Sequence, residues 1–281
     1  MTRVFGIFGH PIGHSRSPAM HNRAFAALGI DAAYVPFDVA PERLPAAVAA
    51  IHGLNLQGLN VTLPHKTAVM ALLDRVEPDA LAIGAVNTIF RDGAQLVGMN
   101  TDAPGLARAL EAVEAPVRSA RITVVGAGGA ARASVVGLAR AGASHVAIAA
   151  RREAEAERLV SQLSAAVGST QLTWCPWQPA ALAQRFSSSD LVVQATSATL
   201  DDGSYAATFA ATLPFDRLPR HAAVVDLVYR PRETSVLRAA AQHGLRAIDG
   251  LGMLLHQGAI AFEQWTGQPA PIAVMRAALH D

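Results

Sequence analysis

A run of glycines directly after an apolar segment is the feature that most constrains the fold of this chain. Residues 121–125 read Arg-Ile-Thr-Val-Val, and Gly126-Ala127-Gly128-Gly129-Ala130-Ala131 follow at once. A helical pattern runs from about residue 130 to 141, and an apolar segment at 145–150 predicts a second strand. A strand, a glycine turn, a helix and a strand in this order predict a βαβ unit with parallel strands. The chain is therefore predicted to be an α/β protein.

The remaining segments extend this prediction to two domains. Further strands are predicted at 171–174, 191–194, 223–228 and 245–248, which with the first two make the six strands of a complete doubly wound sheet. The first hundred residues predict a separate α/β region, with strands near 4–8 and 34–39 and helices near 42–54 and 67–73. A length of 281 residues is enough for both.

The glycine run also predicts a ligand. Glycines let the backbone approach a pyrophosphate, and the following helix N-terminus receives its charge, so a dinucleotide site is expected here. The expected contact residues are Gly126, Ala127, Gly128, Gly129 and Ala130. Arg151 and Arg152 follow the second strand where an acid would favour NAD, so NADP is the better prediction. The alternative is that both arginines are solvated residues at a helix start.

The segment Asn60-Val61-Thr62-Leu63-Pro64-His65-Lys66 predicts a catalytic strand end. Alternation places Asn60 and Thr62 on one face of a strand, opposite Val61 and Leu63. Proline suits the first turn of a helix, so Lys66 is expected where strand becomes helix, beside two hydrogen-bonding side chains. The alternative is an edge strand with a solvated lysine.

Other polar groups are predicted to join this strand end. Three strand ends finish in small polar residues, namely Asn60 with Thr62, Asn87 with Thr88, and Asn100 with Asp102. Ser15 and Ser17 would point the same way in an extended loop, although Ser17 before Pro18 also fits a helix N-cap. Together these side chains predict a pocket that hydrogen-bonds several hydroxyl groups.

Composition narrows the classes of partner. The net charge is +1, which gives no reason to expect nucleic acid or an anionic membrane as the main partner. No apolar stretch reaches the length of a membrane span or a signal-peptide core. Cys175 is the single cysteine, which excludes an internal disulfide and fits the cytoplasm. His10 and His14 are separated by Pro11 and Gly13, so no metal site is expected.

The motifs, taken together, resemble the shikimate dehydrogenase family. The matching segments are Gly13-His14-Ser15-Arg16-Ser17-Pro18, residues 60–66, Gly84-Ala85-Val86-Asn87-Thr88, Asn100-Thr101-Asp102, the glycine run, residues 226–231 and residues 250–258. They follow the family order from about residue 6 to 267. The resemblance implies the reversible, NADP-dependent reduction of 3-dehydroshikimate to shikimate, a step of aromatic amino-acid biosynthesis.

The resemblance also implies roles for particular residues. Lys66 and Asp102 would be the catalytic pair, and the substrate would be held by Ser15, Ser17, Asn60, Thr62, Asn87, Tyr229 and Gln257. Thr196, Leu227 and Gly250 would join the glycine run and the two arginines in holding NADP. The implied domains are residues 1–104 with C-terminal helices 250–281 for substrate, and a Rossmann-type domain over 105–249. The expected assembly is a monomer or homodimer.

Several positions depart from the family pattern and leave alternatives open. Ala150 and Arg152 replace a usual Asn and Thr, and Glu155 stands where a second phosphate-binding arginine is common. Gln194 replaces an Asn, and Thr199 stands at a usual glycine. The strictness of the preference for NADP over NAD is therefore left open. A quinate or aminoshikimate dehydrogenase and a catalytically weak regulatory homologue remain as alternatives.

Overall fold

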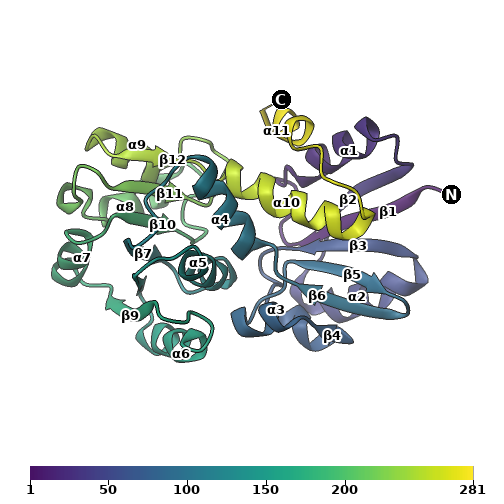
Figure 1. The fold of residues 1–281 in the computed structure, drawn as a ribbon, viewed down its shortest axis with the longest axis horizontal. Coiled ribbons are helices and arrows are strands. Elements are labelled where there is room, and N and C mark those ends of the chain that lie inside the picture. Colours follow the sequence, from purple (N-terminus) through teal and green to yellow (C-terminus); the bar gives the residue numbers. More distant parts are fainter. Residues whose placement is uncertain (281) are drawn as a thin grey trace. The chain divides into compact units, whose positions relative to one another are not determined.

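The computed structural model describes residues 1–280, which form two compact units. One unit contains residues 1–101 and 254–280, and the other contains residues 102–253. Each unit is built around its own sheet with helices against it, which confirms the predicted α/β class (Figure 1). The chain leaves the first unit after Thr101 and returns to it at Leu254.

The first unit has a mixed sheet of six strands within residues 1–101. In spatial order these are β2 (Ala32–Asp38), β1 (Arg3–Gly9), β3 (Leu56–Val61), β5 (Thr88–Asp92), β6 (Gln95–Met99) and β4 (Arg75–Val76). Strand β3 is parallel to β1, whereas β5 is antiparallel to both β3 and β6. The C-terminal end of β3 therefore lies beside the start of β5 and the end of β6. Three polar strand ends meet at one sheet edge for this reason.

Helices and short 3-10 helices accompany this sheet. They are α1 (Ser17–Ala27), the 3-10 helix η1 (Pro41–Arg43), α2 (Leu44–Gly53), the 3-10 helix η2 (Ala68–Leu72), α3 (Pro78–Ile83) and α11 (Ile272–His280). In α2, Leu44, Val48 and Ile51 share one helix face and pack with Leu59 and Val61 of β3. Helix α11 packs against α1, which ties the C-terminal segment to the first unit (Figure 1).

The second unit has a parallel sheet of six strands within residues 121–248. Its strands, in spatial order, are β12 (Arg246–Ile248), β11 (Ala223–Asp226), β10 (Leu191–Gln194), β7 (Arg121–Val125), β8 (His145–Ala150) and β9 (Gln171–Pro176). The pairings are parallel throughout. This is the doubly wound order expected from the sequence, with its switch point between β7 and β10.

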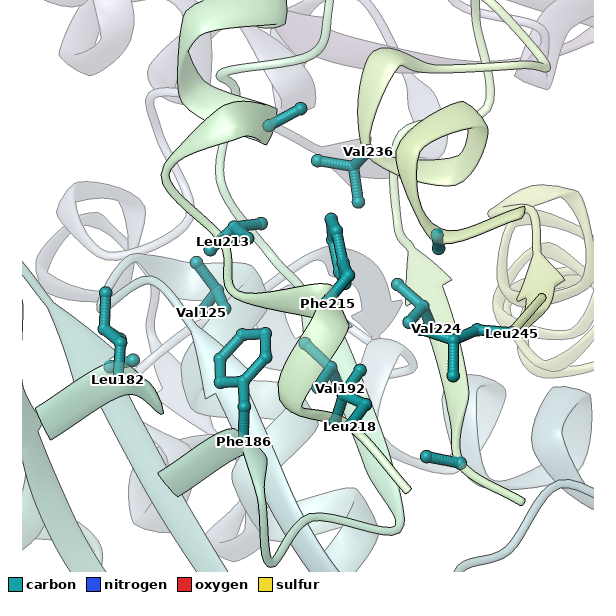
Figure 2. Close-up of a cluster of buried hydrophobic side chains, with 14 of the residues drawn as sticks. Val125, Leu182, Phe186, Val192, Leu213, Phe215, Leu218, Val224, Val236 and Leu245 are labelled. Atoms are coloured by element: carbon teal, nitrogen blue, oxygen red, sulfur yellow. The ribbon is translucent and has the colours of Figure 1, made fainter. Parts of the chain in front are cut away.

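Helices of the second unit bury the other half of its core. They are α4 (Asp102–Ala112), α5 (Gly129–Arg140), α6 (Glu153–Leu163), α7 (Pro179–Phe186), α8 (Ser204–Ala211), the 3-10 helix η3 (Phe215–Arg217), α9 (Ser235–Gln242) and α10 (Leu251–Thr266), which continues into the first unit. Figure 2 shows Phe186 of α7 and Phe215 of η3 against Val192 and Val224, which project from β10 and β11. This packing fixes the positions of the strand ends above it.

Candidate functional site

Lys66 lies in a turn between β3 and η2, and its backbone is held in place. Its carbonyl oxygen accepts a hydrogen bond from Val86 N at 2.8 Å. Lys66 is expected where the strand becomes a helix, and a helix is predicted near 67–73; the structure has a 3-10 helix at Ala68–Leu72, and Lys66 lies in the turn before it. The Leu63–Pro64 peptide bond is cis. Lys66 is therefore part of a turn and not of a helix.

The residues on either side of Pro64 anchor the turn to the sheet. Thr62 N donates to Phe8 O at 2.9 Å, which extends the pairing of β1 and β3 beyond Val61. The ring of His65 is 1% exposed, and its Nε2 lies 2.6 Å from Val39 O, to which it donates as the Nε2–H tautomer. The turn is therefore held by the backbone hydrogen bond from Thr62 N to Phe8 O, by the His65 ring, and by the hydrogen bond that the Lys66 carbonyl oxygen accepts.

Asn87 is the centre of a buried hydrogen-bond network at this sheet edge. Its Nδ2 donates to Thr101 Oγ1 at 2.9 Å and to Gln257 Oε1 at 3.3 Å, while its Oδ1 accepts from Thr101 N at 2.7 Å. Gln257 of α10 in turn donates to Leu254 O at 2.8 Å. Gln257 lies 170 positions from Asn87 in sequence, and helix α10 brings it to the sheet edge.

Asn60 belongs to the same network, and its amide is oriented by Tyr34. The Tyr34 hydroxyl donates to Asn60 Oδ1 at 2.7 Å. Asn60 Nδ2 donates to Thr88 Oγ1 at 3.0 Å and to Asn87 O at 3.2 Å. Both N–H groups of the Asn60 amide are thus used inside the protein, and the second lone pair of Oδ1 is the capacity that is left for a ligand.

The two serines lie at the start of α1. Ser17 is 3% exposed and is the first residue of the helix, and its backbone N donates to Ser15 Oγ at 3.3 Å. The interpretation of Ser17 as the N-cap is wrong, because Arg16 occupies that position and no side chain caps the helix. The Ser17 hydroxyl is therefore not used as a cap.

Asp102 is the first residue of α4, where a carboxylate suits the positive end of the helix. Its side chain is buried, with 4% exposure. The preceding residue, Thr101, is the one whose backbone N binds Asn87. Asp102 is consequently one peptide bond from the Asn87 network, although the residue itself belongs to the second unit.

The glycine run at the end of β7 forms an open backbone surface. Gly126 has a φ of +119°, and a Cβ there would lie 2.9 Å from Thr196 Cγ2. Gly128 is the N-cap of α5, has no side-chain cap, and would have nothing within 4 Å of a Cβ. Uncapped N–H groups at the start of a 12-residue helix, beside backbone without side chains, fit a pyrophosphate. The residues therefore fit the dinucleotide that the sequence predicts.

Arg151 and Arg152 follow β8 and are exposed. Arg152 Nη2 lies 2.7 Å from Glu155 Oε2, and these side chains are 78% and 35% exposed. Glu155 is thus ion-paired with Arg152, one of the two arginines predicted to bind a 2′-phosphate. An exposed pair of this kind contributes little free energy and can exchange for a stronger anion.

The remaining predicted contact residues lie in loops after the other strands of the second unit. Thr196 is two residues past the end of β10, while Leu227 and Tyr229 follow β11 and are partly buried. Gly250 precedes α10, and a Cβ there would lie 2.4 Å from Leu227 O. Thr196, Leu227 and the glycine run are thus at the carboxyl ends of adjacent parallel strands, where dinucleotides bind in such sheets.

Three side chains that take part in the hydrogen bonds of the candidate site were not singled out from the sequence, namely Tyr34, Thr101 and His65. Tyr34 is 3% exposed, and a buried tyrosine hydroxyl needs a partner, but nothing local identifies Asn60 as that partner. Among residues 1–280 there is no cluster of three His, Cys, Asp or Glu side chains that could hold a metal ion. Within the same residues, no helix is long and apolar enough to cross a membrane.

Comparisons with known proteins point to one family along nearly the whole chain. Residues 7–89 match the family described as shikimate dehydrogenase substrate binding domain, residues 108–232 match shikimate / quinate 5-dehydrogenase, and residues 250–280 match shikimate 5'-dehydrogenase C-terminal domain. The shikimate dehydrogenase (NADP(+)) of Geobacter metallireducens is 44% identical over 276 residues, which cover 98% of this chain and 95% of the relative.

Solved structures show the same fold with more than one named activity. Shikimate 5-dehydrogenase from Thermus thermophilus, in complex with NADP(H) and shikimate, has a TM-score of 0.86 at 37% identity, covering 99% of both chains. The ligand-free 5-ketofructose reductase of a Gluconobacter strain has a TM-score of 0.85 at 32% identity, covering 100% of this chain and 98% of the other.

Proposed function

This chain belongs to the shikimate dehydrogenase family, and from that premise we propose that it interconverts 3-dehydroshikimate and shikimate with NADP as its cofactor. The observation that carries the proposal is the backbone arrangement around Asn87. Lys66 O is bonded to Val86 N, directly before Asn87, and Thr101 N, directly before Asp102, is bonded to the Asn87 side chain. The adjacent residues Val86 and Asn87 thereby link the chain segments of both proposed catalytic residues.

The proposed chemistry assigns proton transfer to Lys66. NADP, when held by the second unit, would supply or accept the hydride. Reduction of the ring ketone leaves a negatively charged oxygen, and the ammonium group of Lys66 donates a proton to it. In the oxidising direction the neutral amine accepts that proton. Asp102 is proposed to bind the same hydroxyl and to orient it toward Lys66.

The proposed substrate contacts come from the polar sheet edge and the loop before α1. Ser15 and Ser17 bind one side of the ring, and Asn60, Asn87 and Gln257 bind its hydroxyl groups. Thr62 and Tyr229 are proposed as further contacts. The presence of both Ser15 and Ser17 is proposed to favour shikimate over rings that are bulkier at C1, such as quinate. The 5-ketofructose reductase adds a third substrate class to test.

The cofactor assignment rests on the fit of the second unit. The uncapped start of α5 is proposed to bind the pyrophosphate, and Arg151 with Arg152 the 2′-phosphate. The Arg152–Glu155 pair makes this preference for NADP less strict than a pair of free cations would. We further propose that the enzyme is cytoplasmic, because its one cysteine, Cys175, is buried and forms no disulfide. A monomer or homodimer is the proposed assembly.

A steady-state comparison tests the proposal directly. Shikimate, quinate and the reduced product of 5-ketofructose are each assayed with NADP and with NAD. We expect the highest kcat/KM for shikimate with NADP. Higher kcat/KM for another substrate would reassign the specificity within the family. Absence of turnover with every pairing would reject the enzyme in favour of a regulatory protein.

A further inference from the structure

Two departures from the family pattern, Gln194 and Thr199, meet at one buried carboxylate. Gln194 ends β10 and Asp226 ends β11, and the two are paired in register. Gln194 Nε2 donates to Asp226 Oδ1 at 3.1 Å, and Thr199 Oγ1 donates to Asp226 Oδ2 at 2.9 Å. Gln194 Nε2 also donates to Thr199 Oγ1 at 3.0 Å. All three residues are 0% exposed. The two substitutions therefore belong to one triangle of hydrogen bonds.

Both oxygens of the Asp226 carboxylate also accept hydrogen bonds from neutral donors outside this triangle. Thr234 Oγ1 donates to Oδ2 at 2.7 Å, and Val228 N donates to Oδ1 at 3.0 Å. Burial raises the pKa of Asp226, and these hydrogen bonds act against that shift. A buried carboxylate is costly unless its lone pairs are bonded, so each donor is held firmly in place.

The same residues fix the backbone of the loop at 195–199. Thr196 N donates to Gln194 Oε1 at 2.5 Å. Gln194 Nε2 also lies 3.1 Å from Thr196 O, so its two N–H groups are shared among three acceptors, namely Thr196 O, Thr199 Oγ1 and Asp226 Oδ1. Ala198 N donates to Thr196 Oγ1 at 3.1 Å. The side chain of Gln194 thus closes a small ring with the Thr196 peptide, and Thr199 anchors the far end of the loop to Asp226.

This loop adjoins the other elements of the proposed cofactor site. A Cβ on Gly126 would lie 2.9 Å from Thr196 Cγ2, so the loop rests against the glycine run. Leu227 N donates to Gln194 O at 3.0 Å, which aligns the loop after β11 with the end of β10. The apolar core beneath, which includes Val192 and Val224, supports both strand ends (Figure 2).

We propose that Gln194, Thr199 and Asp226 are positioning residues that hold the loop at 195–199 in the conformation that binds NADP. The glutamine supplies the reach that a shorter asparagine lacks, and the threonine supplies the hydroxyl that bridges it to the carboxylate. Gln194 and Thr199 therefore depend on each other, because they are hydrogen-bonded to each other and to the same carboxylate. This inference rests on the proposed cofactor site, and it adds residues that do not themselves touch the cofactor.

The test replaces the Thr199 hydroxyl and keeps its shape. In Thr199→Val the bridge to Asp226 is lost, and in Thr199→Ser it is kept. Titration calorimetry measures the dissociation constant of NADP, and steady-state kinetics measure the KM of shikimate. The rates of amide hydrogen exchange at Thr196 and Ala198 are measured in the cofactor-free protein. Hydrogen bonds to charged groups are strong enough for Thr199→Val to weaken NADP binding at least about fivefold.

The expected pattern separates positioning from general damage. In Thr199→Val the amides of Thr196 and Ala198 exchange faster, and the KM of shikimate stays within about twofold of the wild type. Thr199→Ser has the NADP affinity and the exchange rates of the wild type. Thr234→Val is the matched control, because it removes another donor to Asp226 and the N-cap of α9 but leaves the loop bonds in place. It lowers the melting temperature without weakening NADP binding more than about twofold.

Two outcomes would overturn the inference. The first is wild-type NADP affinity and loop exchange in Thr199→Val, and the second is equal weakening in Thr199→Val and Thr234→Val. Should Thr199→Val fail to fold, Gln194→Asn breaks the ring to Thr196 and gives the same readouts. A wild-type protein that binds no NADP would reject the proposed cofactor site instead, while hydrogen exchange would still report on the loop.

Discussion

At Lys66 the proposed chemistry depends on a single amine. Lys66→Ala removes the proton donor and acceptor, and general acid–base catalysis contributes about 2–4 kcal/mol to the transition state. We expect kcat to fall by roughly 30- to 1000-fold, with a much smaller change in the KM of shikimate. Steady-state kinetics measure both values.

The neighbouring exposed residue provides the control for Lys66. Thr67→Ala changes the same turn without touching the amine, and it is expected to keep wild-type kcat within about twofold. Equal kcat in Lys66→Ala and the wild type would remove Lys66 from the mechanism. A large loss in both variants would point to the turn and not to the amine.

His21 makes the stability of the first unit depend on pH. Its ring is 0% exposed, stacks on Tyr34 at 4.5 Å, and has no hydrogen-bond partner at either nitrogen within residues 1–280. Burial lowers the pKa of His21 from 6.5 to about 3. Between these values the unfolded chain binds a proton that the folded chain does not, so acidification favours unfolding.

We therefore expect the free energy of unfolding to fall as the pH drops from 6.5 toward 3, by as much as about 5 kcal/mol from this residue. His21→Phe should flatten this dependence and leave the value above pH 7 similar or higher. Denaturant titrations at several pH values measure it, and His52→Phe at an exposed position is the control. An unchanged slope in His21→Phe would show that other groups cause the acid sensitivity.

Among the elements, the contact between α4 and α5 depends on the absence of one side chain. A Cβ on Gly137 of α5 would lie 2.5 Å from Ala103 O of α4, and a backbone carbonyl inside a helix has little room to move. Gly137→Ala should therefore destabilise the protein by about 1–3 kcal/mol, although alanine is the better helix former. Thermal and denaturant unfolding measure the change.

Gly128→Ala is the matched control on the same helix. Its Cβ would have nothing within 4 Å, and its φ of −81° is open to alanine, so stability should change by less than about 0.5 kcal/mol. Its NADP affinity should fall, because the added methyl group faces the proposed pyrophosphate site. Similar losses of stability in both variants would contradict the assignment of Gly137 to packing and Gly128 to binding.

At the scale of the whole molecule, each unit is expected to respond separately to damage in its own core. Trp265 of α10 donates to Ile89 O at 3.0 Å and lies 5.4 Å from the ring of Phe5 in the first unit. Trp177 stacks on Phe209 at 5.8 Å in the second unit. Replacing either tryptophan with alanine should cost about 3 kcal/mol.

Hydrogen exchange locates the damage. Trp265→Ala should raise exchange in β1 and β5, and Trp177→Ala should raise it in β9 and α8. Each variant thus serves as the control for the other. Equal increases in both sheets from a single substitution would mean that the chain unfolds as one cooperative unit.

Local patterns allowed much of this architecture to be predicted. The strands at 121–125, 145–150 and 191–194 have the predicted bounds, because largely apolar runs between turn residues leave little choice of structure. The turn at Lys66 was harder, since a proline after a strand is compatible with a helix or with a bend. The structure has a turn followed by the 3-10 helix η2.

The sequence by itself determined the doubly wound sheet, the glycine run at its switch point and the polar character of the strand ends, because each depends on residues that are close along the chain. Only the tertiary structure decided which polar groups bond to each other. Asn87 binds Gln257 across 170 positions, Tyr34 orients Asn60, and Gln194 and Thr199 share Asp226. The physical reason is that a buried polar group must find a partner, whereas the fold as a whole determines which one.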